Sequence, residues 1–371
     1  MLILVANLGS TSFKFKLLDM ERDGVEVARG GYERIGQPES PHKTHGDVID
    51  VILAELQAKP HAIGFKAVHG GPISGAVRVT DDVIATMEQF ADVAPAHNPP
   101  YIAAMKAFRQ KLPSVPQVAA FETAFHQTIP LSRQIYAIPH EWTEKLGIRR
   151  YGFHGASHRY IATRVPEILG RDKSRRIISC HLGGSCSICA IESGKSVANS
   201  FGMTAQSGVP HNNRVGDFDT FALLKLLKQG QSIDDIFKSL SKQGGMLGMS
   251  GVSPDMRDIE REAASGNERA RLAIDAFVES VRHYIGAYLV ALGGCDVLVF
   301  TGGIGENGIG IREAICRNLA FAGIDLDHNK NQVRGKETEI SSVESRTAIW
   351  IVPTNEELIV ARQTQAVLNA N

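Results

Sequence analysis

The sequence predicts an α/β protein built from two related halves. Residues 3–17 read ILVANLGSTSFKFKL, and residues 177–191, about half a chain later, read IISCHLGGSCSICAI. Each segment has an apolar run, a Leu-Gly step, a Ser-rich turn and a second strand-like run, which is typical of a β-hairpin. The length of 371 residues exceeds the usual size of a single core. Apolar strands alternate with helical segments, which favours sheets covered by helices.

The tips of the two hairpins are suited to phosphate. Gly9, Gly183 and Gly184 permit backbone angles that other residues resist. The Ser and Thr hydroxyls in the same turns add donors beside backbone N–H groups, and phosphate oxygens accept from both. One Gly-Ser turn is commonplace. The repetition is what favours a shared function, with phosphate held between the two halves.

The first half is expected to continue with alternating elements. Residues 20–46 are polar and turn-rich. The next expected elements are a helix around 46–58, a strand at 62–71, a helix opened by the Pro-rich segment 94–100, and a buried strand at 117–122. Residues 126–150 show no clear period and are interpreted as the crossover between the halves.

The second half is expected to be richer in helix. Helices are expected at 156–169, 218–229, 231–242 and 266–292, strands at 296–301 and 348–353, and a last helix after the TNEEL segment. The helix at 266–292 should begin at Ser265 or Asn267 and stop at Gly293-Gly294. Its apolar residues, which include Leu272, cover much of its circumference. We therefore expect it to lie in the core, with a subunit interface as the alternative.

Composition excludes several classes of protein. The formal net charge is +0, which argues against a nucleic-acid-binding surface. The opening MLILVA is too short for a signal peptide or a membrane span, so a soluble, cytoplasmic protein is expected. The five cysteines are odd in number, which disfavours a disulfide framework. Cys186 and Cys189 have CxxC spacing, but on a strand they point to opposite faces. They are interpreted as reduced core thiols.

Two further segments contain residues suited to ligand binding. Residues 302–308, GGIGENG, follow a strand but match neither the GxGxxG nor the Walker pattern. A turn whose backbone approaches a nucleotide is expected there, with a plain strand-to-helix turn as the alternative. His154 and His158 are four residues apart, but Gly155 lies between them and no HExxH glutamate is present, which disfavours zinc. His158 is interpreted as a helix cap, and His154 as a ligand contact.

Three charged residues in loop-like contexts indicate phosphoryl transfer. Lys66 precedes the segment Val68-His69-Gly70-Gly71, Glu122 follows an apolar strand, and Arg214 lies in HNNRVGDFD. Phosphoryl transfer needs cations on the transferring oxygens and a carboxylate or amide to organise magnesium. A single charge of this kind is usually solvated or paired, so the prediction depends on the three together.

The chain resembles a known family over essentially its whole length, with the matching segments in the same order. The matching segments are NLGSTSFKF, AVHGG, APAHNPP, FETAFHQTIP, RRYGFHGASHRYI, HLGGSCS, GKSV, RVGDFD, FTGGIGENG and PTNEELIVARQT. They resemble acetate kinases, and FETAFHQ and YGFHGxSH are the most specific to acetate and propionate kinases. The resemblance implies the duplicated, ribonuclease H-like fold of the sugar kinase, Hsp70 and actin superfamily, with a central cleft. It implies reversible phosphoryl transfer from ATP to a short-chain carboxylate, giving an acyl phosphate and ADP, with Mg²⁺.

The resemblance also implies a role for individual positions of this sequence. Residues implied to organise the metal are Asn7 and Glu356. Residues implied to be catalytic are Lys66, Glu122, His154 and Arg214, of which His154 and Arg214 are implied to stabilise the transferring phosphoryl group. Residues implied to hold the nucleotide and its phosphates are Ser10, Ser12, Lys14, His181, Gly183, Gly184, Asp255, Met256, Arg257, Gly303, Gly305, Glu306 and Asn307. Residues implied to line the acyl pocket are Val68, Ala96, His97, Phe153 and Ala205.

Several positions depart from the pattern usual in that family. Lys66 replaces an arginine, which keeps the charge but loses the bidentate fork, and Glu122 replaces the catalytic aspartate. Gly184-Ser185 replaces Asn-Gly in the second hairpin, and HNN at 211–213 replaces MGT. Ala96 replaces a leucine and Ala205 a proline. These last two changes suggest a roomier acyl pocket and a preference for propionate or butyrate over acetate.

The expected protein is therefore a carboxylate kinase with two domains, 1–145 plus 357–371 and 146–356. The resemblance implies a homodimer. Two alternatives stay open. One is a kinase of the same fold with another phosphoryl donor or acceptor, favoured by the changed positions. The other is an ATP-binding protein with weak catalysis, disfavoured because Lys66, Glu122, His154 and Arg214 keep polar or charged chemistry.

Overall fold

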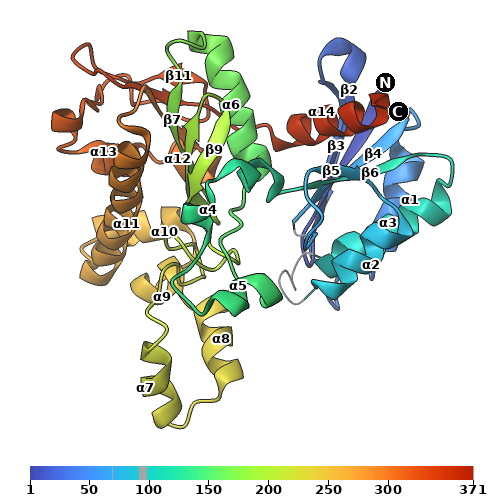
Figure 1. The fold of residues 1–371 in the computed structure, drawn as a ribbon, viewed down its shortest axis with the longest axis horizontal. Coiled ribbons are helices and arrows are strands. Elements are labelled where there is room, and N and C mark those ends of the chain that lie inside the picture. The colour runs from blue at the N-terminus through green and yellow to red at the C-terminus, as the bar shows by residue number, and fades with distance from the viewer. Residues whose placement is uncertain (69, 92–97, 371) are drawn as a thin grey trace. The chain divides into compact units, whose positions relative to one another are not determined.

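The fold consists of two compact units with the same sheet topology (Figure 1). The structure is a computed structural model that describes residues 1–68, 70–91 and 98–370. Unit 1 comprises 1–125, 155–160 and 355–371, and unit 2 comprises 126–154 and 161–354. The domain boundaries expected from the sequence stay a prediction.

Each unit contains a six-stranded mixed sheet. In unit 1 the order is β3 (Val25–Tyr32), β2 (Phe13–Asp19), β1 (Leu2–Leu8), β4 (Ala62–Ala67), β6 (Gln117–Phe121) and β5 (Ala76–Arg78). In unit 2 it is β9 (Lys195–Asn199), β8 (Cys186–Glu192), β7 (Arg176–Leu182), β10 (Val297–Thr301), β12 (Ala348–Ile351) and β11 (Thr338–Glu339). Parallel and antiparallel pairings occur at equivalent places in the two sheets. The predicted duplication of an α/β domain is confirmed.

The first sheet is covered by helices on both faces because its strands alternate. Leu4 and Ala6 of β1 pack in the core with α1 (His45–Glu55), α2 (Asp81–Gln89) and α3 (Asn98–Lys111). Ile3 and Val5 point to the opposite face and pack with Leu358 and its neighbours on α14 (Glu356–Asn369). Successive side chains of a strand point to opposite faces, so one apolar run supplies both cores. The C-terminal helix thereby lies against the N-terminal strand.

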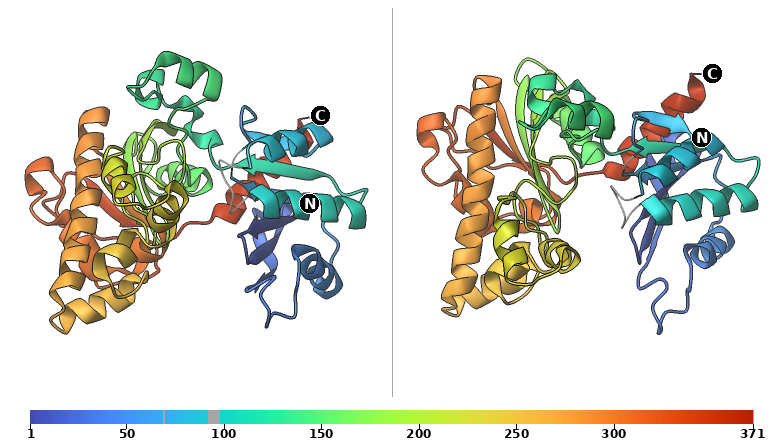
Figure 2. Two further views of the ribbon diagram at one scale, coloured as in Figure 1. Left: turned by 90° about the horizontal axis from the view of Figure 1, so that it is seen from below. Right: turned by 60° about the horizontal axis from the view of Figure 1, so that its bottom comes forward.

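The second sheet packs against the long helix α11 (Glu268–Leu292), as Figures 1 and 2 show. Asn267 caps this helix and Gly293 ends it in the left-handed region, at φ 67°, as predicted. Phe277, Val281 and Ile285 are buried against β7, β8 and β10. The core position expected for Leu272 is wrong, because that side chain is 67% exposed.

The remaining helices of unit 2 connect its strands. They are α4 (Leu131–Gln134), α5 (His140–Leu146), α7 (Ala222–Lys228), α8 (Ile233–Lys242), α9 (Gly245–Ser250), α10 (Met256–Ala264), α12 (Gly302–Asn307) and α13 (Ile309–Cys316). Helix α6 (Gly155–Leu169) begins in unit 1 and continues in unit 2. Short 3₁₀ turns occupy Met20–Arg22, Ala124–Thr128 and Ala320–Ala322. No helix of the described residues is long and apolar enough to cross a membrane.

Three sequence interpretations need correction. Residues 20–46 contain a strand, β3, which forms an edge of the first sheet and buries little, so it has no apolar pattern. The segment expected to be a turn at 302–308 is mostly helical, as α12. His158 is not a cap: it lies within α6 and is fully buried, and the capping position belongs to His154.

The cysteine interpretation is confirmed. All five thiols are free and buried. Cys186 packs in the core beside α11, whereas the Cys189 Sγ lies 3.4 Å from the Ser196 Oγ, on the other face of β8. Burial raises the pKa of both thiols to about 12. They therefore stay protonated and unreactive at neutral pH.

Candidate functional site

Unit 1 holds a buried cluster of one lysine and two carboxylates. Lys66 comes from the end of β4, Glu122 directly follows β6, and Glu356 is the first residue of α14. The Lys66 Nζ lies 3.4 Å from the Glu122 Oε1 and donates a hydrogen bond to Glu356. The three side chains are 16%, 6% and 13% exposed. Three segments far apart in the sequence therefore meet at the carboxyl ends of the neighbouring strands β4 and β6.

The electrostatics of this cluster favour binding a further cation. Neither carboxylate oxygen of Glu122 accepts a hydrogen bond from the described residues, although both are buried. Burial raises the pKa of Glu122, Lys66 lowers it, and Glu356 raises it, with a net increase. Burial would lower the pKa of Lys66, but the attraction of Glu356 and Glu122 outweighs it and raises the pKa well above its usual range. One lysine therefore serves two carboxylates.

The first hairpin, formed by β1 and β2, carries polar side chains at and near its tip. Asn7 pairs directly with Lys14 across the two strands. The Leu8 N–H donates to the buried Tyr101 Oη at 2.9 Å, and the Gly9 N–H donates to the Ser12 carbonyl at 2.9 Å, closing the tip. Ser10 and the Lys14 side chain are exposed. Val68, which follows β4, packs at the margin of the unit 1 core.

A close backbone approach fixes the position of Glu122. A Cβ atom added to Gly155 would lie 1.9 Å from the Glu122 carbonyl oxygen, so only glycine fits at the start of α6. His154, which precedes it, has φ 56°, in the left-handed region that non-glycine residues rarely adopt. Strain of this kind is concentrated at functional sites. The YGFHG segment is thus shaped by its backbone as much as by its side chains.

Unit 2 gathers two histidines at the second hairpin. The His154 Nδ1 lies 2.9 Å from the Ser187 Oγ, and its ring lies 4.2 Å from the ring of His181. Ser187 and His181 are cross-strand partners on β8 and β7. Phe153 is buried, with its ring edge-on to Phe201 at 5.5 Å. The sheet therefore orients His154, which the sequence singled out.

Arg214 is held by the loop that follows β9. Its Nη1 donates to the Ala205 carbonyl at 2.6 Å, and burial lowers the pKa of the guanidinium, although not enough to neutralise it at physiological pH. His211 lies three residues earlier, fully buried. Its Nδ1 accepts from the Cys186 N–H at 2.9 Å, and its Nε2 lies 3.2 Å from the Ser207 carbonyl.

The two hydrogen bonds of His211 require a neutral ring. A ring that accepts at Nδ1 and donates at Nε2 is the neutral tautomer. Burial, and then the charge of Arg214, lower the pKa of His211 to about 3. The ring also stacks on Phe201 at 5.2 Å. His211 is therefore a neutral side chain whose hydrogen bonds connect the second hairpin to the loop before Arg214.

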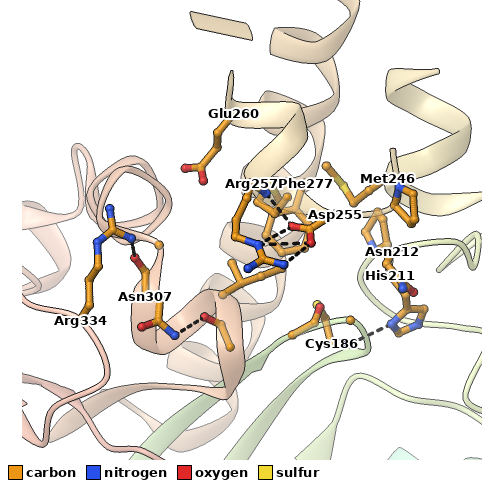
Figure 3. Close-up of a pocket in the computed structure, with 18 residues that line it drawn as sticks. Cys186, His211, Asn212, Met246, Asp255, Arg257, Glu260, Phe277, Asn307 and Arg334 are labelled. Carbon is orange, nitrogen blue, oxygen red and sulfur yellow. Dashed lines mark hydrogen bonds and ion pairs between the residues drawn. The ribbon is translucent and has the colours of Figure 1, made fainter. Parts of the chain in front are cut away.

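A cavity of about 530 Å³ opens beside the second hairpin (Figure 3). Sequence-predicted residues among its lining are Gly183, Gly184, Asp255, Met256, Arg257, Gly303 and Asn307. Ile304 and Gly308, from the predicted GGIGENG segment, also line it. The lining residues outside the predicted sites are Cys186, Pro210, His211, Asn212, Met246, Pro254, Glu260, Phe277 and Arg334. Its volume falls in the range typical of small-molecule sites.

The polar rim of the cavity is well ordered by hydrogen bonds. Asp255 caps α10 and accepts from the backbone and the side chain of Arg257, which lower its pKa to about 2. The Asn307 Nδ2 donates to the Gly303 carbonyl at 2.9 Å, and Arg334 donates to the Asn307 carbonyl. Burial raises the pKa of Glu260, which Figure 3 shows between Arg257 and Arg334.

Comparison with known proteins decides the family. The model of the acetokinase family matches residues 46–362. The chain is 43% identical to the acetate kinase of Natranaerobius thermophilus, covering 99% of this chain and all of that one, and 41% identical to the acetate kinase of Halothermothrix orenii over both full lengths. The chain belongs to the acetokinase family.

Solved structures of acetokinases have the same fold. The acetate kinase of Porphyromonas gingivalis superimposes with a TM-score of 0.92 at 40% identity, and a propionate kinase of Francisella tularensis with a TM-score of 0.92 at 37% identity. Each comparison covers 99% of both chains. The duplicated fold of the wider kinase superfamily, expected from the resemblance, is thereby confirmed.

The roles predicted for individual residues of this acetokinase stay predictions, and the cavity is lined by only some of the residues predicted to hold the nucleotide. Gly305, Glu306 and His181 do not line the cavity, and the Glu306 Oε1 accepts from the Gly302 and Thr354 N–H groups instead. Two of the residues predicted for the acyl pocket, Ala96 and His97, lie outside the described residues.

Two supporting residues were missed by sequence reasoning. His126, in FETAFHQ, is buried, with its Nε2 2.8 Å from the Phe153 carbonyl and its Nδ1 2.9 Å from the Ser196 Oγ. Arg312 is fully buried and donates to the Gly305 carbonyl and to the Asn331 Oδ1. The motif position of His126 could have indicated its importance, but Arg312 carries no sequence signal.

Proposed function

We propose that this acetokinase transfers the γ-phosphoryl group of ATP to the carboxylate of a short-chain acid, giving an acyl phosphate and ADP. The observation that carries the proposal is the buried Lys66–Glu122–Glu356 cluster, with a carboxylate whose oxygens accept no hydrogen bond from the described residues. Such a carboxylate is poised for a cation that arrives with the substrate. The names of the similar acetate and propionate kinases support the acceptor class.

The reaction is a direct in-line transfer. An oxygen of the acceptor carboxylate forms a bond to the γ-phosphorus, the bond to the β–γ bridging oxygen breaks, and the electron pair leaves on ADP. Lys66 and Arg214 are cations for the transferring oxygens, and His154, oriented by Ser187, is a hydrogen-bond donor to them. Positioning and charge neutralisation supply most of the catalysis in such transfers. No phosphorylated form of Glu122 is required.

The residues present fit a magnesium ion that arrives with the nucleotide. Mg²⁺ prefers oxygen ligands and commonly uses only one or two protein carboxylates beside phosphates and water. Glu122 offers two buried oxygens that accept no hydrogen bond from the described residues, and Glu356 and Asn7 offer further oxygen donors. The ion would neutralise charge that develops on the phosphate oxygens. Among the described residues no group of three His, Cys, Asp or Glu side chains is arranged as a metal site.

The nucleotide is proposed to occupy the cavity of unit 2. Its volume, its glycine-lined hairpin tip and its apolar wall at Met246, Met256 and Phe277 suit a nucleoside with a phosphate chain. The tip of the second hairpin, whose Gly183 and Gly184 line this cavity, is proposed to contact phosphate oxygens. Gly183 and Gly303 approach closely there, since a Cβ added to Gly183 would lie 3.7 Å from the Gly303 nitrogen.

The acyl pocket is proposed to accept a chain longer than that of acetate. Val68, Phe153 and Ala205 are its proposed members among the described residues, and Ala205 contacts Arg214 through its carbonyl. One additional buried methylene is worth about 0.8 kcal/mol, which corresponds to a few-fold change in kcat/KM per carbon. Propionate or butyrate should therefore exceed acetate as substrate.

A hydroxamate assay across a panel of donors and acids tests the function. Acetate, propionate, butyrate and longer acids are each combined with ATP, GTP or pyrophosphate. Formation of acyl hydroxamate with ATP and a short-chain acid is the expected result. Turnover only with another donor or acid would favour the related kinase with changed specificity. Binding of ATP without turnover of any acid would favour a nucleotide-binding protein.

We further propose a cytoplasmic homodimer. The apolar residues Phe221, Leu224 and Phe237, on and beside α7 and α8, are exposed, as is Val290 on α11. Exposed apolar side chains grouped on neighbouring helices are typical of association surfaces. Sedimentation velocity should give the mass of a dimer, and aspartate in place of Phe221 or Val290 should identify the surface that is used.

A further inference from the structure

The loop 211–213 places a side-chain amide beside the tip of the second hairpin. Asn212 lines the cavity together with Gly183 and Gly184 of that tip. Its own N–H donates to the Gly184 carbonyl at 3.1 Å. Figure 3 shows Asn212 at the edge of the cavity that also bears His211 and Cys186. Asn212 belongs to none of the predicted ligand-binding positions.

The orientation of the Asn212 amide is fixed by the chain itself. Its Oδ1 accepts from the Asn213 N–H at 2.9 Å, which assigns the oxygen and leaves the NH₂ group on the other side. That NH₂ group lies 3.5 Å from the position that a Cβ of Gly184 would occupy. The described residues supply no hydrogen-bond acceptor for the Asn212 Nδ2. Two N–H donors therefore face the glycine tip.

The loop that carries Asn212 is held from both sides. The Met246 and Leu247 N–H groups donate to the carbonyls of His211 and Asn212, each at 2.8 Å. On the opposite side, the neutral His211 ring accepts from the Cys186 N–H of the hairpin. The amide is therefore presented on a rigid support, which limits the entropy lost when it binds a ligand.

Because the amide is a rigid, outward-facing donor in a cavity proposed for a nucleotide, its natural acceptor is anionic. We propose that Asn212 binds the phosphate chain of the nucleotide and supplies the amide that this hairpin tip lacks at Gly184. The inference rests on the proposed use of a nucleotide. The sequence resemblance is consistent with this proposal, since the family pattern that it implies has an asparagine where this chain has Gly184 and a glycine where this chain has Asn212. The two positions are in contact here.

Binding of ADP and of adenosine, measured by calorimetry without any acid, tests the inference. Asn212→Asp keeps an oxygen for the Asn213 N–H but replaces the NH₂ group with a charged oxygen. Asn212→Gly removes the amide. Hydrogen bonds to charged groups typically contribute enough for about a tenfold to hundredfold effect. We expect the Kd for ADP to rise by that factor in Asn212→Gly and further in Asn212→Asp, with adenosine affinity within about twofold.

A transplant and a matched control complete the experiment. Adding Gly184→Asn to Asn212→Gly should recover ADP affinity to within about fivefold of the original protein. The asparagine at 184 then supplies a side-chain amide at the hairpin tip in place of the amide lost at 212. Asn213→Ala changes a neighbour that does not line the cavity and should leave ADP affinity unchanged. Thermal unfolding of each unliganded variant reports whether the loop itself is disturbed.

The outcomes separate this inference from the proposed function. Asn212→Asp that binds ADP as tightly as the original protein would overturn the inference, as would an equal loss of ADP and adenosine affinity. Failure of the proposed function has another signature: the original protein would bind ADP and yet form no acyl phosphate, in which case the Asn212 results would still stand.

Discussion

Replacing Lys66 with methionine should destabilise unit 1 by about 3–5 kcal/mol at pH 8. Lys66 is the cation that faces both Glu122 and Glu356 among the described residues, and all three side chains are at least four-fifths buried. Removing the lysine leaves two carboxylates without their counter-charge, which is the case in which a buried ion pair matters most. Lys66→Arg keeps the charge and should cost less than about 1.5 kcal/mol.

The loss should depend on pH in a defined direction. Burial and the neighbouring Glu356 raise the pKa of Glu122 in the folded state, and removing Lys66 takes away the charge that lowers it. A carboxyl group whose folded pKa is raised contributes stability that is complete below its unfolded pKa and is lost as the pH rises through the folded value. The destabilisation by Lys66→Met should therefore be smaller at pH 5 than at pH 8, because protonation neutralises the carboxylates.

Hydrogen exchange localises this effect to unit 1. Both tryptophans, Trp142 and Trp350, lie in unit 2, so their fluorescence reports the other half of the chain and serves as the internal control. Exchange of peptides covering 62–67 and 117–121 follows the strands that bear the cluster. A loss below about 1 kcal/mol, equal at pH 5 and pH 8, would refute the proposed charge balance. Adding Glu122→Gln to Lys66→Met should recover part of the loss.

Three other perturbations test separate parts of the structure. Glu122→Gln should abolish acyl phosphate formation while ADP still binds, and unchanged turnover would remove Glu122 from the mechanism. The pKa of His211 is about 3 in the folded protein and about 6.5 in the unfolded chain. The free energy of unfolding should therefore be unaffected by this group above pH 6.5, and should fall by up to about 1.4 kcal/mol per pH unit as the pH decreases from about 6.5 towards 3. Acid titration of unfolding should show that slope, and His211→Gln should flatten it. Gly155→Ala forces a Cβ to within 1.9 Å of the Glu122 carbonyl oxygen and should cost about 1–3 kcal/mol in chemical unfolding, whereas a neutral result would mean that the helix start is adaptable.

The sequence predicted the elements with strong local patterns. The two hairpins match because an apolar run, a glycine and a Ser-rich turn specify such a motif with few residues. The ends of α11 were predictable because Asn267 and Gly293 are a side-chain cap and a left-handed stop. Strand β3 was missed because an exposed edge strand has no apolar face to detect.

The candidate site was only partly predictable, because its supports are distant in the sequence. Lys66, Glu122 and Glu356 were each singled out, but the sharing of one lysine between two carboxylates depends on sheet order and on the return of the C-terminal helix. The supporting role of Arg312 could not be predicted, because its hydrogen-bond acceptors lie up to 21 residues away and are mostly backbone carbonyls. Asn212 needed the three-dimensional contact with the hairpin tip before a role could be inferred.

Product stoichiometry is the most direct test of phosphoryl transfer from ATP to a carboxylate. ADP and hydroxamate-trapped acyl phosphate are quantified in the same reaction, with and without acid. Direct transfer should give one acyl phosphate for each ADP, ADP formation that requires the acid, and no phosphorylated protein when the acid is omitted. ADP release without acyl phosphate, or a stable phosphoprotein formed in the absence of acid, would contradict it.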